Sequence, residues 1–142
     1  MAVSGPSGGT GGGAFTDPED TFRVARVTIR TGLFVDSVQM THERPDGSLV
    51  TFPHRGGFGG NERSHDLAVG EHIIRVDGRF GVFVDSIDIF TDRGQSLRGG
   101  GRGGRADYRY EAPGGYEIVG FVGRSGIFVD AIGVILRALP SP

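Results

Sequence analysis

Three copies of one nine-residue motif constrain the fold of this chain more than any other feature of its sequence. The motif R-x-G-[LVI]-F-V-D-[SA]-[VI] occupies residues 30–38, 79–87 and 124–132, at offsets of 49 and 45. A second motif, GGxGG, occupies residues 8–12, 56–60 and 100–104, at offsets of 48 and 44. Because the two motifs repeat in step, they predict one domain over residues 1–142 with three internal repeats, each carrying one copy of both motifs.

Each nine-residue motif lies between two segments rich in β-branched and aromatic residues, which is typical of strands. The predicted strands are 22–29, 72–76 and 117–122 before the motifs, and 35–41, 84–91 and 129–136 after them. Each motif is therefore expected to form a β-hairpin, with its glycine at the turn in a positive-φ conformation and its Asp at the start of the outgoing strand. Turns are expected at 45–47 and 92–94.

The composition predicts an all-β fold. Val, Ile, Phe and Leu together supply 39 of the 142 residues, and only six of these are Leu, the usual helix filler. No segment shows a helical period, whereas the apolar residues of the outgoing strands alternate with polar or small ones, at Val38/Met40, Ile87/Ile89 and Ile132/Val134. Three such units would pack their inner faces around a pseudo-threefold axis and place the three Asp hairpins at one end.

Several functional classes are disfavoured by charge and composition. The net charge of −2 disfavours nucleic acid and anionic membranes as partners. The chain has no cysteine, and its His residues at 42, 54, 65 and 72 show no metal-ligand spacing, so no cofactor or metal is expected. No apolar stretch is long enough for membrane insertion, and the start lacks the features of a signal peptide. A cytoplasmic protein, or one released without a classical signal peptide, is expected, and a homodimer is compatible with the sequence.

The repeated Asp and glycine residues suggest a binding site for a neutral polyol. Asp36, Asp85 and Asp130 are ordinary turn residues on one interpretation, but Gly, Phe, Val and Asp are identical in all three copies while their neighbours differ. The GGxGG segments are either packing loops or rows of bare backbone N–H groups that a ligand can reach. Together, a carboxylate and free amides match the donors and acceptors of adjacent sugar hydroxyls.

The spacing predicts which loop faces which hairpin. Asp36 precedes Gly56 by 20 residues and Asp85 precedes Gly100 by 15. From Asp130, through the two termini, to Gly8 would be 142 − 130 + 8 = 20 residues. Each Asp hairpin is therefore expected to face the GGxGG loop that follows it, and the last hairpin to face the first loop.

These motifs resemble jacalin-related lectins of the mannose-binding type. The resemblance rests on the stretch GFVGRSGIFVDAIG at 120–133 and on the early glycine loop followed by Phe15-Thr16-Asp17, and it covers essentially the whole chain. It implies a β-prism I fold of three Greek-key four-stranded sheets and a non-enzymatic, carbohydrate-binding function with three sites per chain. Because the first glycine loop is unbroken, it implies mannose or glucose rather than galactose, with high-mannose glycoproteins as partners.

The same resemblance implies a role for particular residues. Each Asp would bind sugar hydroxyls, two hairpin amides would face the ring, and the last glycine of the loop would complete the site. The implied carbohydrate-binding residues are Asp36, Leu33, Phe34 and Gly60; Asp85, Val82, Phe83 and Gly104; and Asp130, Ile127, Phe128 and Gly12. Leu33, Val82 and Ile127 stand where the family often has a polar residue, which suggests altered selectivity. The Phe side chains would either contact the sugar or belong to the core.

Three other functions remain open at this stage. The segment 97–105 resembles an RGG sequence that binds single-stranded RNA, but it occurs only once. The Asp residues could act as the paired carboxylates of a glycosidase, but no second acid repeats beside them. A structural or oligomerising β module without sugar binding is the strongest alternative.

Overall fold

Strands form the whole of the regular structure in this computed structural model, which describes residues 1–19 and 22–140. It contains 13 strands, and the described residues form no helix, so none that could cross a membrane. The predicted all-β class is confirmed. The turns expected at 45–47 and 92–94 are also present.

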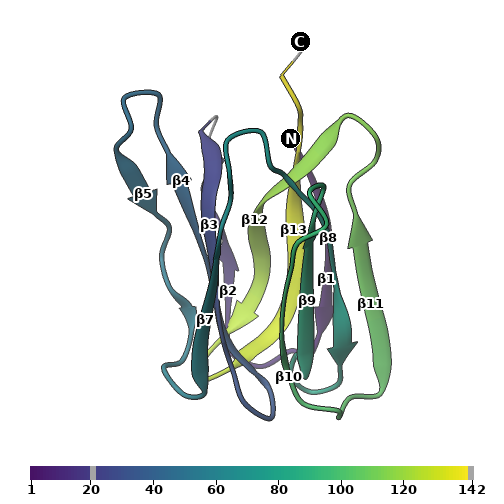
Figure 1. The fold of residues 1–142 in the computed structure, drawn as a ribbon. Coiled ribbons are helices and arrows are strands. Elements are labelled where there is room, and N and C mark those ends of the chain that lie inside the picture. The colour runs from purple at the N-terminus through teal and green to yellow at the C-terminus, as the bar shows by residue number, and fades with distance from the viewer. Residues whose placement is uncertain (20–21, 141–142) are drawn as a thin grey trace.

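The strands pair within three groups that follow the sequence repeats (Figure 1). The first group contains β3 (Arg23–Thr31), β4 (Val35–Glu43), β5 (Leu49–Thr51), β6 (Arg55–Gly56) and β7 (Asn61–Asp66). The second contains β8 (Ile73–Phe80), β9 (Ser86–Thr91), β10 (Ser96–Gly100) and β11 (Ala106–Glu111). The third joins the two ends of the chain: β12 (Tyr116–Ser125), β13 (Val129–Ala138), β1 (Ala2–Gly8) and β2 (Gly13–Thr16).

Two details differ from three separate four-stranded sheets. In the first group, the outer partner of β4 is split into β5 and β6, which pair with opposite ends of β4. The second and third groups are joined by a single pair, Ile118 with Ile73, so that pairing runs continuously through eight strands. The two groups meet again near the hairpin tips, where the Val84 N–H donates to the Val129 carbonyl at 2.9 Å.

The core lies between the inner faces of the three groups. The six apolar residues predicted to alternate inward along the outgoing strands are at most 1% exposed: Val38, Met40, Ile87, Ile89, Ile132 and Val134. Burial of such side chains contributes roughly 1.5–3 kcal/mol each. Near the hairpin tips, the Phe34, Phe83 and Phe128 rings contact one another with centroid separations of 5.0–5.2 Å. These three rings, called here the Phe triad, place equivalent residues of the three repeats around one axis.

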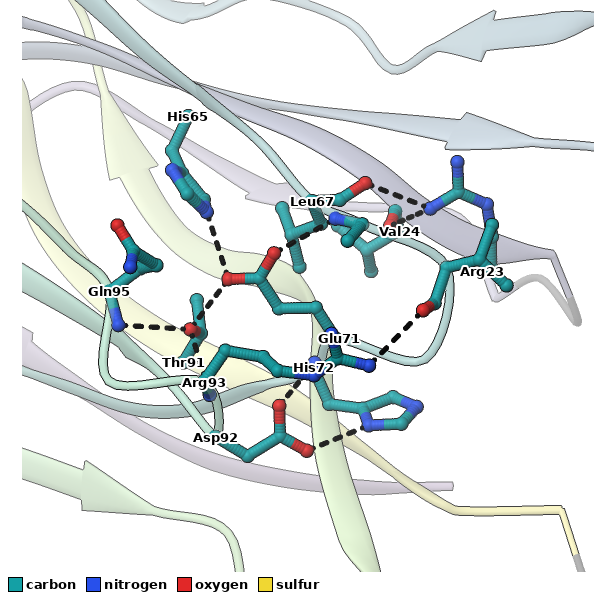
Figure 2. Close-up of polar contacts among 12 residues, drawn as sticks. Arg23, Val24, His65, Leu67, Glu71, His72, Thr91, Asp92, Arg93 and Gln95 are labelled. Carbon is teal, nitrogen blue, oxygen red and sulfur yellow. Dashed lines mark hydrogen bonds and ion pairs between the residues drawn. The ribbon is translucent and has the colours of Figure 1, made fainter.

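A buried carboxylate joins two of the strand groups at the opposite end from the hairpin tips (Figure 2). Glu71 accepts hydrogen bonds from the Thr91 hydroxyl at 2.7 Å and the Ala68 N–H at 2.8 Å, and its Oε2 lies 3.0 Å from His65 Nε2. His65 belongs to β7 and Thr91 to β9. Burial alone would raise the pKa of Glu71, but these three hydrogen bonds outweigh it and hold the pKa below its ordinary value.

Candidate functional site

The three repeated Asp residues occupy equivalent positions at the start of their outgoing strands. Asp36 and Asp130 are the second residues of β4 and β13, and Asp85 directly precedes β9. Each is only 5–6% exposed. Among the described residues, no side chain and no backbone N–H of another residue donates a hydrogen bond to their carboxylate oxygens. The structure therefore holds three acceptors in place that receive no hydrogen bond from any other described residue.

Each Asp hairpin meets the glycine loop that the spacing predicted. The second glycine of each loop donates its N–H to the backbone carbonyl of the Asp: Gly57 to Asp36, Gly101 to Asp85, and Gly9 to Asp130, at 2.8–2.9 Å. The third of these contacts joins the last hairpin to the first loop across the termini, as expected.

The loop glycines approach the carboxylates too closely for a side chain. A Cβ on Gly59 would lie 2.7 Å from Oδ2 of Asp36, and one on Gly60 would lie 2.7 Å from Oδ1. The same holds at the other two carboxylates, where an added Cβ would lie 2.5–3.1 Å from the nearest carboxylate oxygen. The glycines concerned are Gly103 and Gly104 for Asp85, and Gly11 and Gly12 for Asp130. The last two glycines of each loop therefore form a bare wall against the carboxylate.

The glycine of each hairpin was predicted in the wrong conformation. Gly32, Gly81 and Gly126 do not have positive φ, so the turn does not require glycine on conformational grounds. A Cβ at Gly32 would instead lie 3.8 Å from both Oδ1 of Asp36 and the Cα of Gly60. A Cβ at Gly81 would lie 3.8 Å from Oδ1 of Asp85, and one at Gly126 would lie 3.9 Å from Oδ1 of Asp130. These are ordinary contact distances, so a side chain here would fit the fold but would fill the space between carboxylate and loop.

Burial and a neighbouring arginine act in opposite directions on each carboxyl. Desolvation raises the pKa of Asp36, Asp85 and Asp130 above the ordinary value of an Asp side chain. The positive charges of Arg30, Arg79 and Arg124, respectively, oppose this effect and lower the pKa. Each arginine belongs to the same hairpin as the Asp that it affects.

The sequence reasoning missed a structural role for these three arginines. Each guanidinium donates from Nε and Nη2 to the carbonyls of the last two glycines of the facing loop. The distances are 3.0 and 3.2 Å from Arg30 to Gly59 and Gly60, 3.2 and 3.1 Å from Arg79 to Gly103 and Gly104, and 2.9 and 2.8 Å from Arg124 to Gly11 and Gly12. The sequence feature that could have indicated this role is the Arg that begins all three copies of the nine-residue motif.

Each of the three hairpins carries an exposed apolar side chain. Leu33, Val82 and Ile127 are 80%, 64% and 76% exposed. A depression of about 470 Å³ at Asp85 is lined by Phe83 and Val82 of its own hairpin and also by Phe34 of the neighbouring one. The three rings of the Phe triad are half-buried, and two of them, Phe34 and Phe83, both pack together and border this depression.

The three loops differ at their middle residue. This residue is Thr10 in the first loop, Phe58 in the second and Arg102 in the third. Phe58 is largely exposed and stacks on His54, with ring centroids 4.3 Å apart and planes inclined by 4°. The three loops therefore share their backbone geometry but differ in the side chain of their middle residue.

Comparison with known proteins assigns this arrangement to a class. The profile of the Jacalin-like lectin domain matches residues 4–135, and the chain belongs to this family. The family consists of lectins, which bind carbohydrate without catalysis, so the glycosidase alternative is wrong.

Individual relatives match along almost their full length. Horcolin from Hordeum vulgare is 32% identical over 135 residues, which cover 91% of this chain and 92% of horcolin. A structure of Malaysian banana lectin is 28% identical, with a TM-score of 0.84 and coverage of 97% of this chain and 99% of that one. The Calsepa lectin, in complex with a biantennary N-glycan, is 26% identical, with a TM-score of 0.82 and coverage of 97% of both chains. These structural neighbours are β-prism lectins, in agreement with the predicted fold.

Proposed function

We propose that this chain binds mannose- or glucose-type glycans through three equivalent sites, and that high-mannose glycans on glycoproteins are its preferred ligands. The sites are centred on Asp36, Asp85 and Asp130, with the last loop glycines Gly60, Gly104 and Gly12 opposite them. The backbone N–H groups of residues 33–34, 82–83 and 127–128 are the remaining hydrogen-bond donors of the three sites.

One observation carries this proposal: a buried carboxylate that receives no hydrogen bond from any other described residue faces a bare glycine wall, and the arrangement occurs three times. Two adjacent sugar hydroxyls can donate to the two carboxylate oxygens and accept from nearby amides. An anionic ligand would be repelled by the Asp. The N-glycan bound by the Calsepa lectin supports a glycan as the ligand.

Three sites at one end of the molecule suit a branched ligand. When several weak sites engage one glycan, apparent affinity rises by ~10²–10⁴ without any new contact. High-mannose glycans present several terminal mannose residues and would exploit this arrangement.

Calorimetric titration with methyl α-mannoside tests the proposal. The wild-type chain should bind about three equivalents, and Asp36→Asn, Asp85→Asn and Asp130→Asn should each remove one. Gly32→Ala, Gly81→Ala and Gly126→Ala should also remove one each, because the added methyl fills the space between carboxylate and loop without a steric clash.

Gly114→Ala is the matched control for the glycine variants. No atom lies within 4 Å of a Cβ at this position, and its φ is not positive. It should retain all three equivalents. If no mannoside or glucoside binds to the wild type, or if the hairpin variants keep three equivalents, the proposed sites are wrong and the structural β module becomes the better interpretation.

A further inference from the structure

We propose that Arg30, Arg79 and Arg124 are positioning residues that aim the loop amides at the saccharide. This inference rests on the proposed function, because it assigns a role to residues that lie beside the saccharide sites. The structure places the three arginines in the same relation to loop and Asp in all three repeats.

The first step concerns the direction of one peptide group. In a planar trans peptide, the C=O of one residue and the N–H of the next point in opposite directions. Arg30 Nε holds the carbonyl of Gly59 at 3.0 Å, so the N–H of Gly60 points away from the guanidinium. The same relation holds for Gly104 beside Arg79 and for Gly12 beside Arg124. These are the glycines whose amides the proposed sites use.

These amides are available to a ligand. Among the described residues, none accepts a hydrogen bond from the N–H of Gly12, Gly60 or Gly104. Glycine samples many backbone conformations, and without a restraint these peptide groups could rotate. Two donors from one rigid guanidinium fix two successive carbonyls at once, which a single Lys ammonium would do less well.

The second step concerns the charge of the same side chain. Burial raises the pKa of each Asp, and the positive charge of the arginine on the same hairpin opposes that rise. The guanidinium that orients the donors of a site is therefore also compatible with an ionised acceptor beside it.

The hydrogen bonds and the charge of the guanidinium can be tested separately in a chain that keeps only the Asp36 site, made by Asp85→Asn and Asp130→Asn. In this background, Arg30→Lys keeps the positive charge but loses the paired hydrogen bonds, and it should weaken methyl α-mannoside binding by about tenfold, the typical effect of one charge-assisted hydrogen bond. Arg30→Gln removes the charge as well and should weaken binding at least as much as Arg30→Lys.

Arg109→Lys and Arg109→Gln are the matched controls, because Arg109 pairs with Glu111 on β11 and does not contact a loop carbonyl. They should leave the affinity unchanged. Unchanged affinity in both Arg30→Lys and Arg30→Gln would overturn the proposal.

A measurement without sugar keeps this inference distinct from the proposed function. In wild-type protein and in Arg30→Lys, amide hydrogen exchange of Gly60 should differ while exchange of Gly12 and Gly104 stays the same. If the wild type binds no mannoside, the proposed function fails, and with it the ligand-directed role. If it binds mannoside but Gly60 exchange and affinity do not respond to Arg30→Lys, only the positioning role fails.

Discussion

The Phe triad should contribute measurably to stability, and its threefold geometry allows the contribution to be worked out. Each ring contacts the other two at centroid separations of 5.0–5.2 Å. An aromatic pair at this distance contributes about 0.5–1.5 kcal/mol beyond its buried area. Phe83→Leu removes two of the three pairs and should therefore lower the free energy of unfolding by about 1–3 kcal/mol.

Urea unfolding of single and double variants would measure this effect. In the cycle of Phe34→Leu and Phe83→Leu, the coupling energy should be about 0.5–1.5 kcal/mol, and cycles with Phe128→Leu should give similar values. Phe58→Leu is a control that should cost less, because the Phe58 ring is 76% exposed and outside the triad. Coupling below about 0.3 kcal/mol in all three cycles would show that the rings do not stabilise one another.

Three further predictions concern charge and backbone. Because burial raises the pKa of Asp36, Asp85 and Asp130 on folding, their ionised forms cost stability at neutral pH. Asp→Asn at these sites should thus raise the free energy of unfolding at pH 7, with the gain disappearing below about pH 4, and an equal or lower stability at pH 7 would contradict this. The lowered pKa of Glu71 has the opposite sign: its stabilisation is present above its unfolded pKa of about 4.3 and is lost as pH falls through the folded value, so Glu71→Gln should destabilise at pH 7 but not in acid. Gly60→Ala should cost at least about 1 kcal/mol in thermal unfolding, because Gly60 has a φ of +69° and an added Cβ would lie 2.6 Å from the Thr31 backbone, whereas Gly114→Ala should be nearly neutral.

Most features of the fold that could be predicted from the sequence were predicted from its internal repeats. Two motifs in step predicted three units, the alternating residues such as Ile87 and Ile89 predicted the buried face, and the loop spacings predicted which glycines meet which Asp. All of these depend on periodicity, which a single chain displays directly. The division of one outer strand into β5 and β6 has no periodic signal, and it was not predicted.

The residues of the site were predicted from the sequence, but the contacts between them were not. Gly32 was expected to have a positive φ, but its role in the structure is to leave space beside Asp36. Arg30 was seen as part of a motif, but its contact with Gly59 joins residues 29 positions apart and depends on side-chain direction. Likewise, the contacts of His65 and Thr91 with Glu71 appear only once the sheets are assembled. Tertiary geometry decides such pairings, and local sequence does not encode it.

The glycine loop at 8–12 and the hairpin at 124–132 come from opposite ends of the polypeptide, and this has a consequence for the order of events during synthesis. The Arg124 contacts with Gly11 and Gly12 span 113 and 112 positions, against 29 and 30 for Arg30. Contacts between distant positions form slowly because a long loop must close first. A nascent chain could complete the contacts around Asp36 early, while those around Asp130 must wait for the final strand, so all three hairpin–loop arrangements would be present only at the last stage of folding.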